Sequence, residues 1–210
     1  MRIFVAGASG LIGVRLVPLL VGAGHTVAGM TRSADKAPML RDLGAEAVVC
    51  DVFDTAELAR VMTAFAPELV FHQLTDLPDR AAELRQFAGR NDRMRSEGTR
   101  SLLAAAESAG AGRVIAQSIS WELPPARASV TAEHDRMVLA AGGVVVRYGQ
   151  LFGPGTYYPD TPPEPPRVHV DDAARQTMLA LAAPAGLTVV VDDRAVVDER
   201  AVVDERAVFD

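Results

Sequence analysis

The sequence is poor in several residue types on which common protein chemistries depend. Its 210 residues include one cysteine, Cys50, and one lysine, Lys36. A single cysteine excludes an intrachain disulfide and a cysteine metal cluster, and we expect a reducing cytoplasm as its environment. No apolar run approaches the roughly 18–20 residues that cross a bilayer. The first ten residues are interrupted by glycine too early for a signal peptide, so we expect no membrane partner.

Positive charge in this chain rests almost entirely on arginine. Twenty of the 21 cationic residues are arginines, and 27 acidic residues leave a net charge of −6. An acidic chain is a poor ligand for nucleic acid, so we expect a small-molecule substrate instead. Apolar residues make up 49% of the chain, which is enough for a full hydrophobic core. The sequence leaves the oligomeric state open.

Short apolar, β-branched segments alternate with segments of helical period. The expected strands lie at 2–6, 25–31, 45–50, 68–74, 113–117, 144–147 and 188–191, and the expected helices at 11–21, 55–65, 97–108, 128–141 and 171–182. Strands that are apolar throughout are typical of a parallel sheet covered on both faces. The alternation predicts a doubly wound, Rossmann-like α/β fold. We expect its core at 1–150 and a short substrate-side segment at 151–210, packed on the same domain.

Three local features depart from this regular pattern. Pro18 falls inside the first expected helix, where it removes a backbone hydrogen bond and predicts a kink. Six prolines between Gly153 and Arg167 predict an extended loop that either folds over a binding site or only joins two elements. The sequence AVVDER occurs twice, at 195–200 and 201–206. We interpret this as a local duplication that forms an edge strand, an added helix or a frayed tail.

A glycine-rich turn joins the first expected strand to the first expected helix. Gly7 permits the tight turn, Gly10 lets a pyrophosphate approach the backbone, and Gly13 lets the helix pack on the sheet. Free amides and the positive end of the helix then bind phosphate, and the other expected contacts in this turn are Ser9, Leu11 and Ile12. Strand, loop and helix in this order predict a dinucleotide site. The alternative is a glycine turn without a ligand.

Five segments spread over the chain carry the motifs of one family. They are GASGLIG at 7–13, SEGTRSLLAAAESAG at 96–110, RVIAQSIS at 113–120, VVVRYGQLFGPG at 144–155 and RVHVDDAAR at 167–175. In this order they resemble the extended and atypical short-chain dehydrogenase/reductases over nearly the whole chain. The resemblance implies a nicotinamide cofactor. The chain is also faintly similar to the angucyclinone ketoreductases of antibiotic pathways.

The end of the second expected strand bears on the choice of cofactor. An acidic residue there binds the ribose hydroxyls of NAD, whereas an arginine accommodates the 2′-phosphate of NADP. Here Thr31, Arg32 and Ser33 occupy the position, and no carboxylate appears before Asp35. These residues favour NADP(H), and the alternative is an exposed surface arginine.

The resemblance places further residues along the cofactor. Asp51 and Val52 match an acidic–hydrophobic pair that contacts the adenine in the family, although Asp51 is equally well explained as a turn residue. The other expected contacts lie at the ends of later strands: Gln73, Leu74, Thr75, Gln117, Tyr148, Gly149 and Leu151. We expect His72 to be buried in its strand rather than catalytic.

The acid–base pair of the family is absent from this sequence. It is a Tyr-x-x-x-Lys pair, in which the lysine lowers the tyrosine pKa and the tyrosine exchanges a proton with the substrate oxygen. The residue four positions before Lys36 is Arg32, and the helix expected at 128–141 carries Ser129, Thr131, His134 and Asp135 instead. The family's epimerase and dehydratase activities need acid–base work at carbon, so this absence disfavours them.

Hydride transfer requires less of the protein, because the nicotinamide carries the chemistry. Ser118, or in its place Ser120, is the candidate to hydrogen-bond a developing alkoxide. His134 is either an acid that faces the cleft or a solvated surface residue. Four aromatic residues either sandwich a flat substrate or cap a small C-terminal core: Trp121, Phe152, Tyr157 and Tyr158.

These observations lead to one functional hypothesis with two rivals. A ketone flanked by a phenol has an internal hydrogen bond and can be reduced without a protein acid, and aromatic polyketides have this arrangement. We therefore predict an NADPH-dependent ketoreductase of a bulky aromatic polyketide. The rivals are a non-catalytic NADP(H)-binding redox sensor or regulator and a sugar-nucleotide-type epimerase or dehydratase. A sensor would leave Ser118 and Tyr148 without a substrate-sized cavity, whereas a reductase would not.

Overall fold

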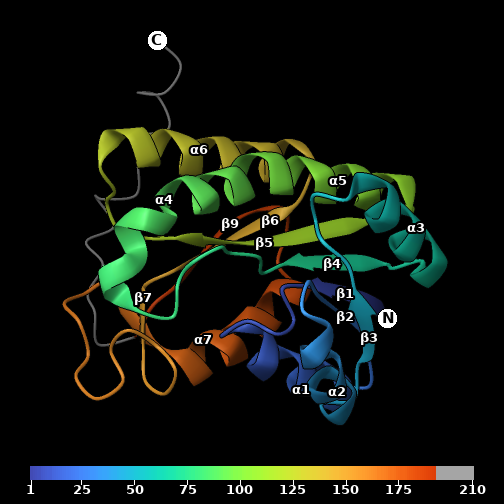
Figure 1. The fold of residues 1–210 in the computed structure, drawn as a ribbon, viewed down its shortest axis with the longest axis horizontal. Helices are drawn as coiled ribbons and strands as arrows, with labels where there is room; N and C mark the ends of the chain where they lie inside the picture. Colours follow the sequence, from blue (N-terminus) through green and yellow to red (C-terminus); the bar gives the residue numbers. More distant parts are fainter. Residues whose placement is uncertain (193–210) are drawn as a thin grey trace.

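A parallel sheet of seven strands forms the centre of the fold (Figure 1). The computed structural model describes residues 1–192, and the AVVDER repeat lies outside them. The strands stand in the order β3-β2-β1-β4-β5-β6-β9. Their bounds are β1 (Arg2–Ala6), β2 (Thr26–Thr31), β3 (Glu46–Val49), β4 (Leu69–His72), β5 (Arg113–Ile119), β6 (Val144–Tyr148) and β9 (Gly186–Val190). This confirms the predicted Rossmann-like α/β fold.

Helices cover both faces of the sheet (Figure 1). One face carries α3 (Thr55–Phe65), α4 (Leu84–Arg93), α5 (Thr99–Ser108) and α6 (Pro125–Ala140); the other carries α1 (Gly13–Gly22), α2 (Ala37–Asp42) and α7 (Val170–Thr177). A π-helical turn, Met94–Gly98, connects α4 directly to α5. After β6 the chain forms a separate ribbon of β7 (Gln150–Phe152) and β8 (Arg167–His169) and then returns to the main sheet as β9.

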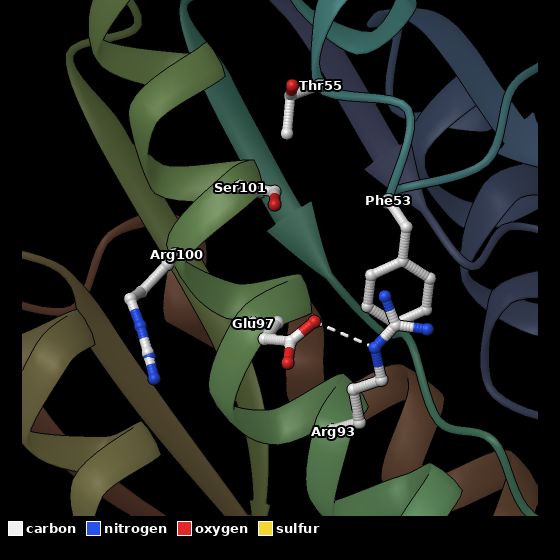
Figure 2. Close-up of a pocket in the computed structure, with 6 residues that line it drawn as sticks. All are labelled: Phe53, Thr55, Arg93, Glu97, Arg100 and Ser101. Atoms are coloured by element: carbon white, nitrogen blue, oxygen red, sulfur yellow. Dashed lines mark hydrogen bonds and ion pairs between the residues drawn. The ribbon is translucent and has the colours of Figure 1, made fainter.

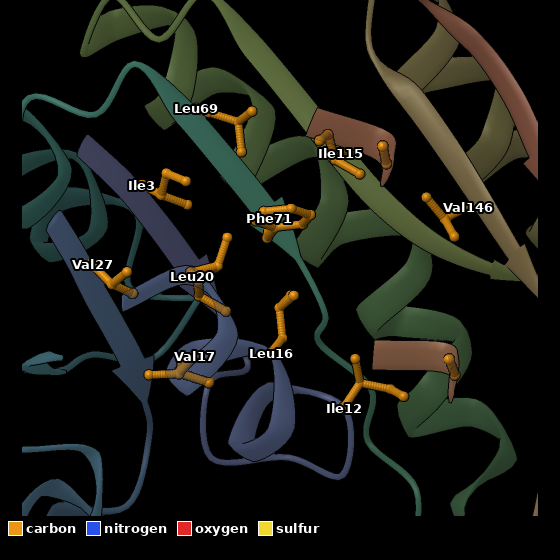
Figure 3. Packing of buried hydrophobic residues seen from close by; sticks show 14 of the residues in the cluster. Ile3, Ile12, Leu16, Val17, Leu20, Val27, Leu69, Phe71, Ile115 and Val146 are labelled. Carbon is orange, nitrogen blue, oxygen red and sulfur yellow. The ribbon is translucent and has the colours of Figure 1, made fainter. Parts of the chain in front are cut away.

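Alternate residues of each strand face opposite helical layers. On β1, Ile3 and Val5 join the core under α1 and α7, whereas Phe4 and Ala6 join the core under α3 and α5. Figure 3 shows the first of these cores, where Leu16 of α1 points toward Phe71 of β4. Both faces of the strands are buried, which explains why they are apolar throughout rather than alternating.

The structure adds elements that the sequence analysis missed. They are α2, α4, β7 and β8. The sequence of α4 is mostly polar and none of its residues is buried, so no run of core residues indicated this helix. Pro18 leaves α1 unbroken from Gly13 to Gly22. It lies on the exposed side, where water can bind the carbonyl that the missing N–H leaves free.

The strand order reverses between β1 and β4, and this reversal positions the site. Connections leaving the carboxyl ends of these two strands diverge to opposite faces, which opens a crevice between them. The N-terminus of α1 and the segment after β4 border this crevice. In residues 1–192, no helix is long and apolar enough to span a membrane.

Replacing Phe71 with alanine should lower the free energy of unfolding by about 3–5 kcal/mol. The ring is fully buried on a central strand, so its removal leaves a cavity between sheet and helix. Leu179→Ala is the matched control, because that side chain is 71% exposed and its loss should change stability by no more than about 0.5 kcal/mol. Urea denaturation followed by circular dichroism measures both. Equal effects would contradict the core described above.

Candidate active site

A cleft of about 1260 Å³ opens at the carboxyl ends of the strands, the edge at which open α/β sheets bind ligands. Most of the residues predicted from the sequence line it: Gly7, Ser9, Gly10, Leu11, Ile12, Thr31, Arg32, Ser33, Asp51, Val52, Gln73, Leu74, Thr75, Gln117, Ser118, Trp121, Tyr148, Gly149, Leu151, Tyr157 and Tyr158. The fold thus brings segments from the whole chain to one cavity. Gly13, Ser120, His134 and Phe152 stand outside its wall.

The glycine loop packs as closely as its sequence predicts. Gly7 has a φ of +87°, and a Cβ there would lie 2.7 Å from the backbone of Gln73. A Cβ at Gly13 would lie 2.3 Å from the Gly7 carbonyl oxygen, whereas at Gly10 it would meet only that oxygen, at 3.2 Å. Gly10 is exposed on the cleft, so a pyrophosphate can approach the amides at the start of α1. The residues present therefore fit a dinucleotide.

Hydrogen bonds join the end of β2 to this loop. The Ser9 hydroxyl donates to Thr31 Oγ1 at 2.9 Å, and the same oxygen accepts the Ser33 amide at 3.2 Å. Val52 is buried at the wall of this part of the cleft. Asp51 combines both predicted roles, because it lines the cleft while its Oδ1 accepts the amide of Phe53 at 3.0 Å in a turn.

Asp76, which the sequence analysis did not single out, binds two arginines beside the cleft. Arg32 donates to Asp76 Oδ1 at 3.0 Å, and Arg90 donates to both carboxylate oxygens, each at 3.0 Å. Burial opposes ionisation of Asp76, but the hydrogen bonds from the two arginines outweigh it and hold its pKa below the usual range. The Arg32 side chain is still 55% exposed, so it is held in place with donors left for an anion.

Tyr148 lines the cleft but cannot act as its acid. Thr177 donates its hydroxyl proton to the Ala173 carbonyl, so Tyr148 must donate its own proton to Thr177 Oγ1, at 2.6 Å. Gln73 Nε2 donates to the phenol oxygen at 3.3 Å. Burial raises the pKa of Tyr148 to about 12. The phenol therefore holds Gln73 in position and keeps its proton.

A chain of hydrogen bonds fixes two buried histidines as neutral imidazoles. The Leu74 amide donates to His72 Nδ1 at 3.3 Å, so His72 Nε2 donates to Thr99 Oγ1 at 3.0 Å. The Thr99 hydroxyl then donates to His134 Nδ1 at 2.8 Å, and His134 Nε2 donates to the Gln117 carbonyl at 3.0 Å. Only this direction of donation satisfies every atom with one proton on each ring.

The surroundings of the two rings oppose protonation. Burial holds the pKa of His72 well below its usual range, and the charge of Arg95, joined by that of His134 when this ring is protonated, lowers it further. Burial and Arg95 lower the pKa of His134 to about 4. The prediction that His72 is buried is confirmed. The prediction that His134 faces the substrate or the solvent is wrong, because the ring is fully buried and both nitrogens are bonded to protein.

The two candidate serines have different environments. Ser118 lines the cleft, and its buried hydroxyl has no hydrogen-bond partner among the described residues. Ser120 is excluded as its substitute, because its hydroxyl donates to the Tyr148 carbonyl at 3.0 Å and it lies off the wall. Phe152 is also wrong as a substrate contact. Pairing of β7 with β8 sets its ring edge-on to His169, with centroids 5.2 Å apart.

The proline-rich loop contributes to the wall of the cleft. Tyr157 and Tyr158 of this loop line it, together with Trp121 from the segment after β5. The Tyr157 hydroxyl donates to the Pro78 carbonyl, and the Tyr158 hydroxyl donates to Gln150 Oε1 at 3.5 Å. The loop therefore does more than join two elements.

Several further polar side chains on the wall were not predicted as site residues, among them Arg95, Arg127 and Thr131. Arg127 and Thr131 stand four positions apart on α6 and share one face of the helix. Arg95 comes from the π-helical turn and is 6% exposed. No motif of the sequence marks these residues, so their place on the wall follows from the fold alone.

A second hollow, of about 280 Å³, lies between the segment after β3 and α5 (Figure 2). Its charged groups already have partners. The Arg93 guanidinium stacks 3.9 Å from the centroid of Phe53 and pairs with Glu97 at 2.7 Å, and Arg100 pairs with Glu133 at 3.4 Å. The chemistry of the protein is therefore assigned to the large cleft.

Fold and cleft together define a Rossmann domain with a nicotinamide dinucleotide site. The NAD(P)H-binding family model matches residues 7–138, and the chain belongs to this family. Solved structures with the same fold include UDP-glucose 4-epimerase of Thermus thermophilus with NAD, with a TM-score of 0.74 and 20% identity over 91% of this chain and 78% of that one. Another is dTDP-glucose 4,6-dehydratase of Streptomyces venezuelae, with a TM-score of 0.72 and 22% identity over 90% and 75%. At this level of identity the similarities concern the fold alone.

Curated relatives share more of the sequence. A 3-diazoavenalumate denitrifying reductase from a Streptomyces species is 36% identical over 182 residues, which cover 75% of this chain and 59% of the relative. The chain thus spans about three fifths of that relative's length. An uncharacterised protein of Mycobacterium tuberculosis is 31% identical over 116 residues, 55% of this chain and 12% of its own length.

The free energy of unfolding should fall as the pH is lowered from about 6.5 to about 4. Both histidines are neutral when folded, with depressed pKa values, so the unfolded chain binds more protons in this window. The carboxylates with lowered pKa values, Glu57, Asp76 and Asp171, contribute from about pH 5 downward, so the part of the window above pH 5 reports the histidines. Urea denaturation at steps of one pH unit measures the slope. Constant stability between pH 7 and 5 would contradict the neutral assignment.

Proposed function

We propose that the protein is an NADPH-dependent reductase of a flat aromatic substrate and uses no proton donor of its own. One observation carries this proposal. The cleft reaches Ser118, yet the protons of the tyrosines and histidines around it are engaged in hydrogen bonds to protein acceptors. The only lysine, Lys36, lines the cleft near Arg32, away from α6.

In this proposal, different residues along the cleft bind the cofactor and stabilise the reacting oxygen. The glycine loop and α1 hold the pyrophosphate, and Gln73 and Gln117 are fixed at the ends of β4 and β5 by their bonds to Tyr148 and the Leu74 carbonyl. When bound, the reduced nicotinamide supplies the hydride. The Ser118 hydroxyl, which lacks a protein partner, can donate to an oxygen that gains negative charge.

The proposed substrate side of the cleft suits a flat apolar molecule. Its wall there includes Trp121, Leu123, Tyr158, Leu77 and Phe87. Leu77 and Tyr158 are 45% and 40% exposed, so they offer apolar surface to a ligand. Aromatic walls bind planar rings through offset or edge contacts.

Two classes of hydride acceptor can be reduced without an acid from the protein. The first is a ketone flanked by a phenol, as in aromatic polyketides, because its internal hydrogen bond stabilises the alkoxide. The second is a diazo arene, favoured by the relative named for reducing 3-diazoavenalumate. There, hydride takes the place of the diazonium group and nitrogen leaves as N₂, so no protein proton is required.

The rival functions receive less support. A redox sensor needs no substrate cavity beside Ser118, whereas a cleft of about 1260 Å³ exceeds the usual size of a single-ligand pocket, roughly 300–1,000 Å³. An epimerase or dehydratase needs an acid–base residue at carbon, and the neutral, fully bonded His134 cannot supply it.

Arg32→Ala should weaken NADPH binding roughly 10- to 100-fold and leave NADH binding unchanged, because Arg32 is the proposed partner of the 2′-phosphate. Arg90→Ala is the matched control, since it also removes a partner of Asp76 but not the arginine at the end of β2. Titrations of reduced-cofactor fluorescence give both affinities. Tighter binding of NADH than of NADPH by the natural chain would refute the cofactor assignment.

With a panel of hydroxyaryl ketones and aryl diazo compounds, absorbance at the reduced-nicotinamide band should fall as product forms. For a ketone, Ser118→Ala should lower kcat about 100-fold or more, because one donor to the alkoxide is lost. Ser120→Ala should act like the natural chain, since its hydroxyl is bonded to the Tyr148 carbonyl. Tight NADPH binding without turnover on any member of the panel would favour the sensor.

A further inference from the structure

Arg95 is a buried cation, and one nitrogen of its guanidinium has no hydrogen-bond partner among the described residues. Its side chain lines the cleft and is 6% exposed. Nη1 is buried and has no hydrogen-bond partner among the described residues. A buried guanidinium nitrogen without a partner is costly, because its hydration is lost and no hydrogen bond replaces it.

The nearest acids do not satisfy it. Asp92 and Asp135 act on Arg95 only through their charge. Asp135 uses Oδ2 to accept two bonds from Arg147, at 2.8 and 2.9 Å, and its Oδ1 is itself unpartnered. The neighbouring His134 is neutral and bonded on both sides. Nη1 of Arg95 therefore keeps N–H donors that no described protein group accepts.

Two polar side chains of α6, a helix that contacts the π-helical turn, line the same cleft. Arg127 adds a second positive charge, and Thr131, which is 8% exposed, adds a hydroxyl. Arg95 itself stands on a π-helical turn between α4 and α5, a type of irregularity that is frequent at functional sites. The cleft thus combines donors of two elements with apolar walls.

We infer that Arg95, with Arg127 and Thr131, binds a carboxylate carried by the aromatic substrate. A planar guanidinium presents parallel N–H donors that match the two oxygens of a carboxylate, better than the single oxygen of a phenolate. This inference rests on the proposed function and specifies its substrate class: an aromatic carboxylate rather than a neutral arene.

Calorimetry on the full chain saturated with NADP⁺ tests this without turnover. The probes are 1-hydroxy-2-naphthoate and its neutral methyl ester. The natural chain should bind the acid at least 10-fold more tightly than the ester, and Arg95→Met should abolish the preference while keeping its NADP⁺ affinity. Arg93→Met is the matched control, because Arg93 lies on the same continuous helix outside the cleft and should keep the preference.

Three results would overturn the inference: equal binding of acid and ester by the natural chain, an unchanged preference in Arg95→Met, or a preference that NADP⁺ abolishes. The last would assign the anion to the phosphate site of the cofactor. If Arg95→Met does not fold, Thr131→Val should still reduce the preference several-fold, and an unchanged preference there would count against the site. Absence of NADPH oxidation would refute the reductase but not this binding preference, so the two failures are distinguishable.

Discussion

The close approach of the glycine loop to the end of β4 is the constraint on which the site depends. At Gly7 the two backbones are so near that a single Cβ would overlap with Gln73. This contact fixes the start of α1 against the strand at the reversal of the sheet. It also sets Gln73, and through it Tyr148, at a defined place in the cleft. Cofactor site and substrate side are therefore parts of one packed unit.

The polar groups around this unit follow one rule, which is that nearly every buried donor has an acceptor. The rule is illustrated by the two histidines, Thr99 and Tyr148. The proton of each of these side chains has one defined acceptor. Against this background the few unpaired atoms are informative. Among the described residues they belong to Arg95, Ser118 and Asp135, and the first two line the cleft. Chemistry and recognition are expected where the protein leaves capacity unused.

The fold and the cofactor half of the site could be predicted because they depend on local sequence. Apolar β-branched strands and glycine spacing follow directly from backbone sterics, and α3 was predicted to the residue. The substrate half depends on contacts between distant segments. His134 reads as a surface residue until Thr99 and Gln117 are seen to enclose it. The roles of Asp76 and Arg95 depend on neighbours on other elements. Hydrophobic periodicity in the sequence does not reveal such contacts.

Lys36 offers a single side-chain amine for selective chemical modification. It is the only lysine in the sequence, and it lies on the wall of the cleft beside Arg32 and Ser33. Apart from the terminal amino group, an acylating or aldehyde reagent has this one primary amine to modify. A fluorophore or affinity handle attached there would be carried at the cofactor's end of the cleft as a single-site reporter.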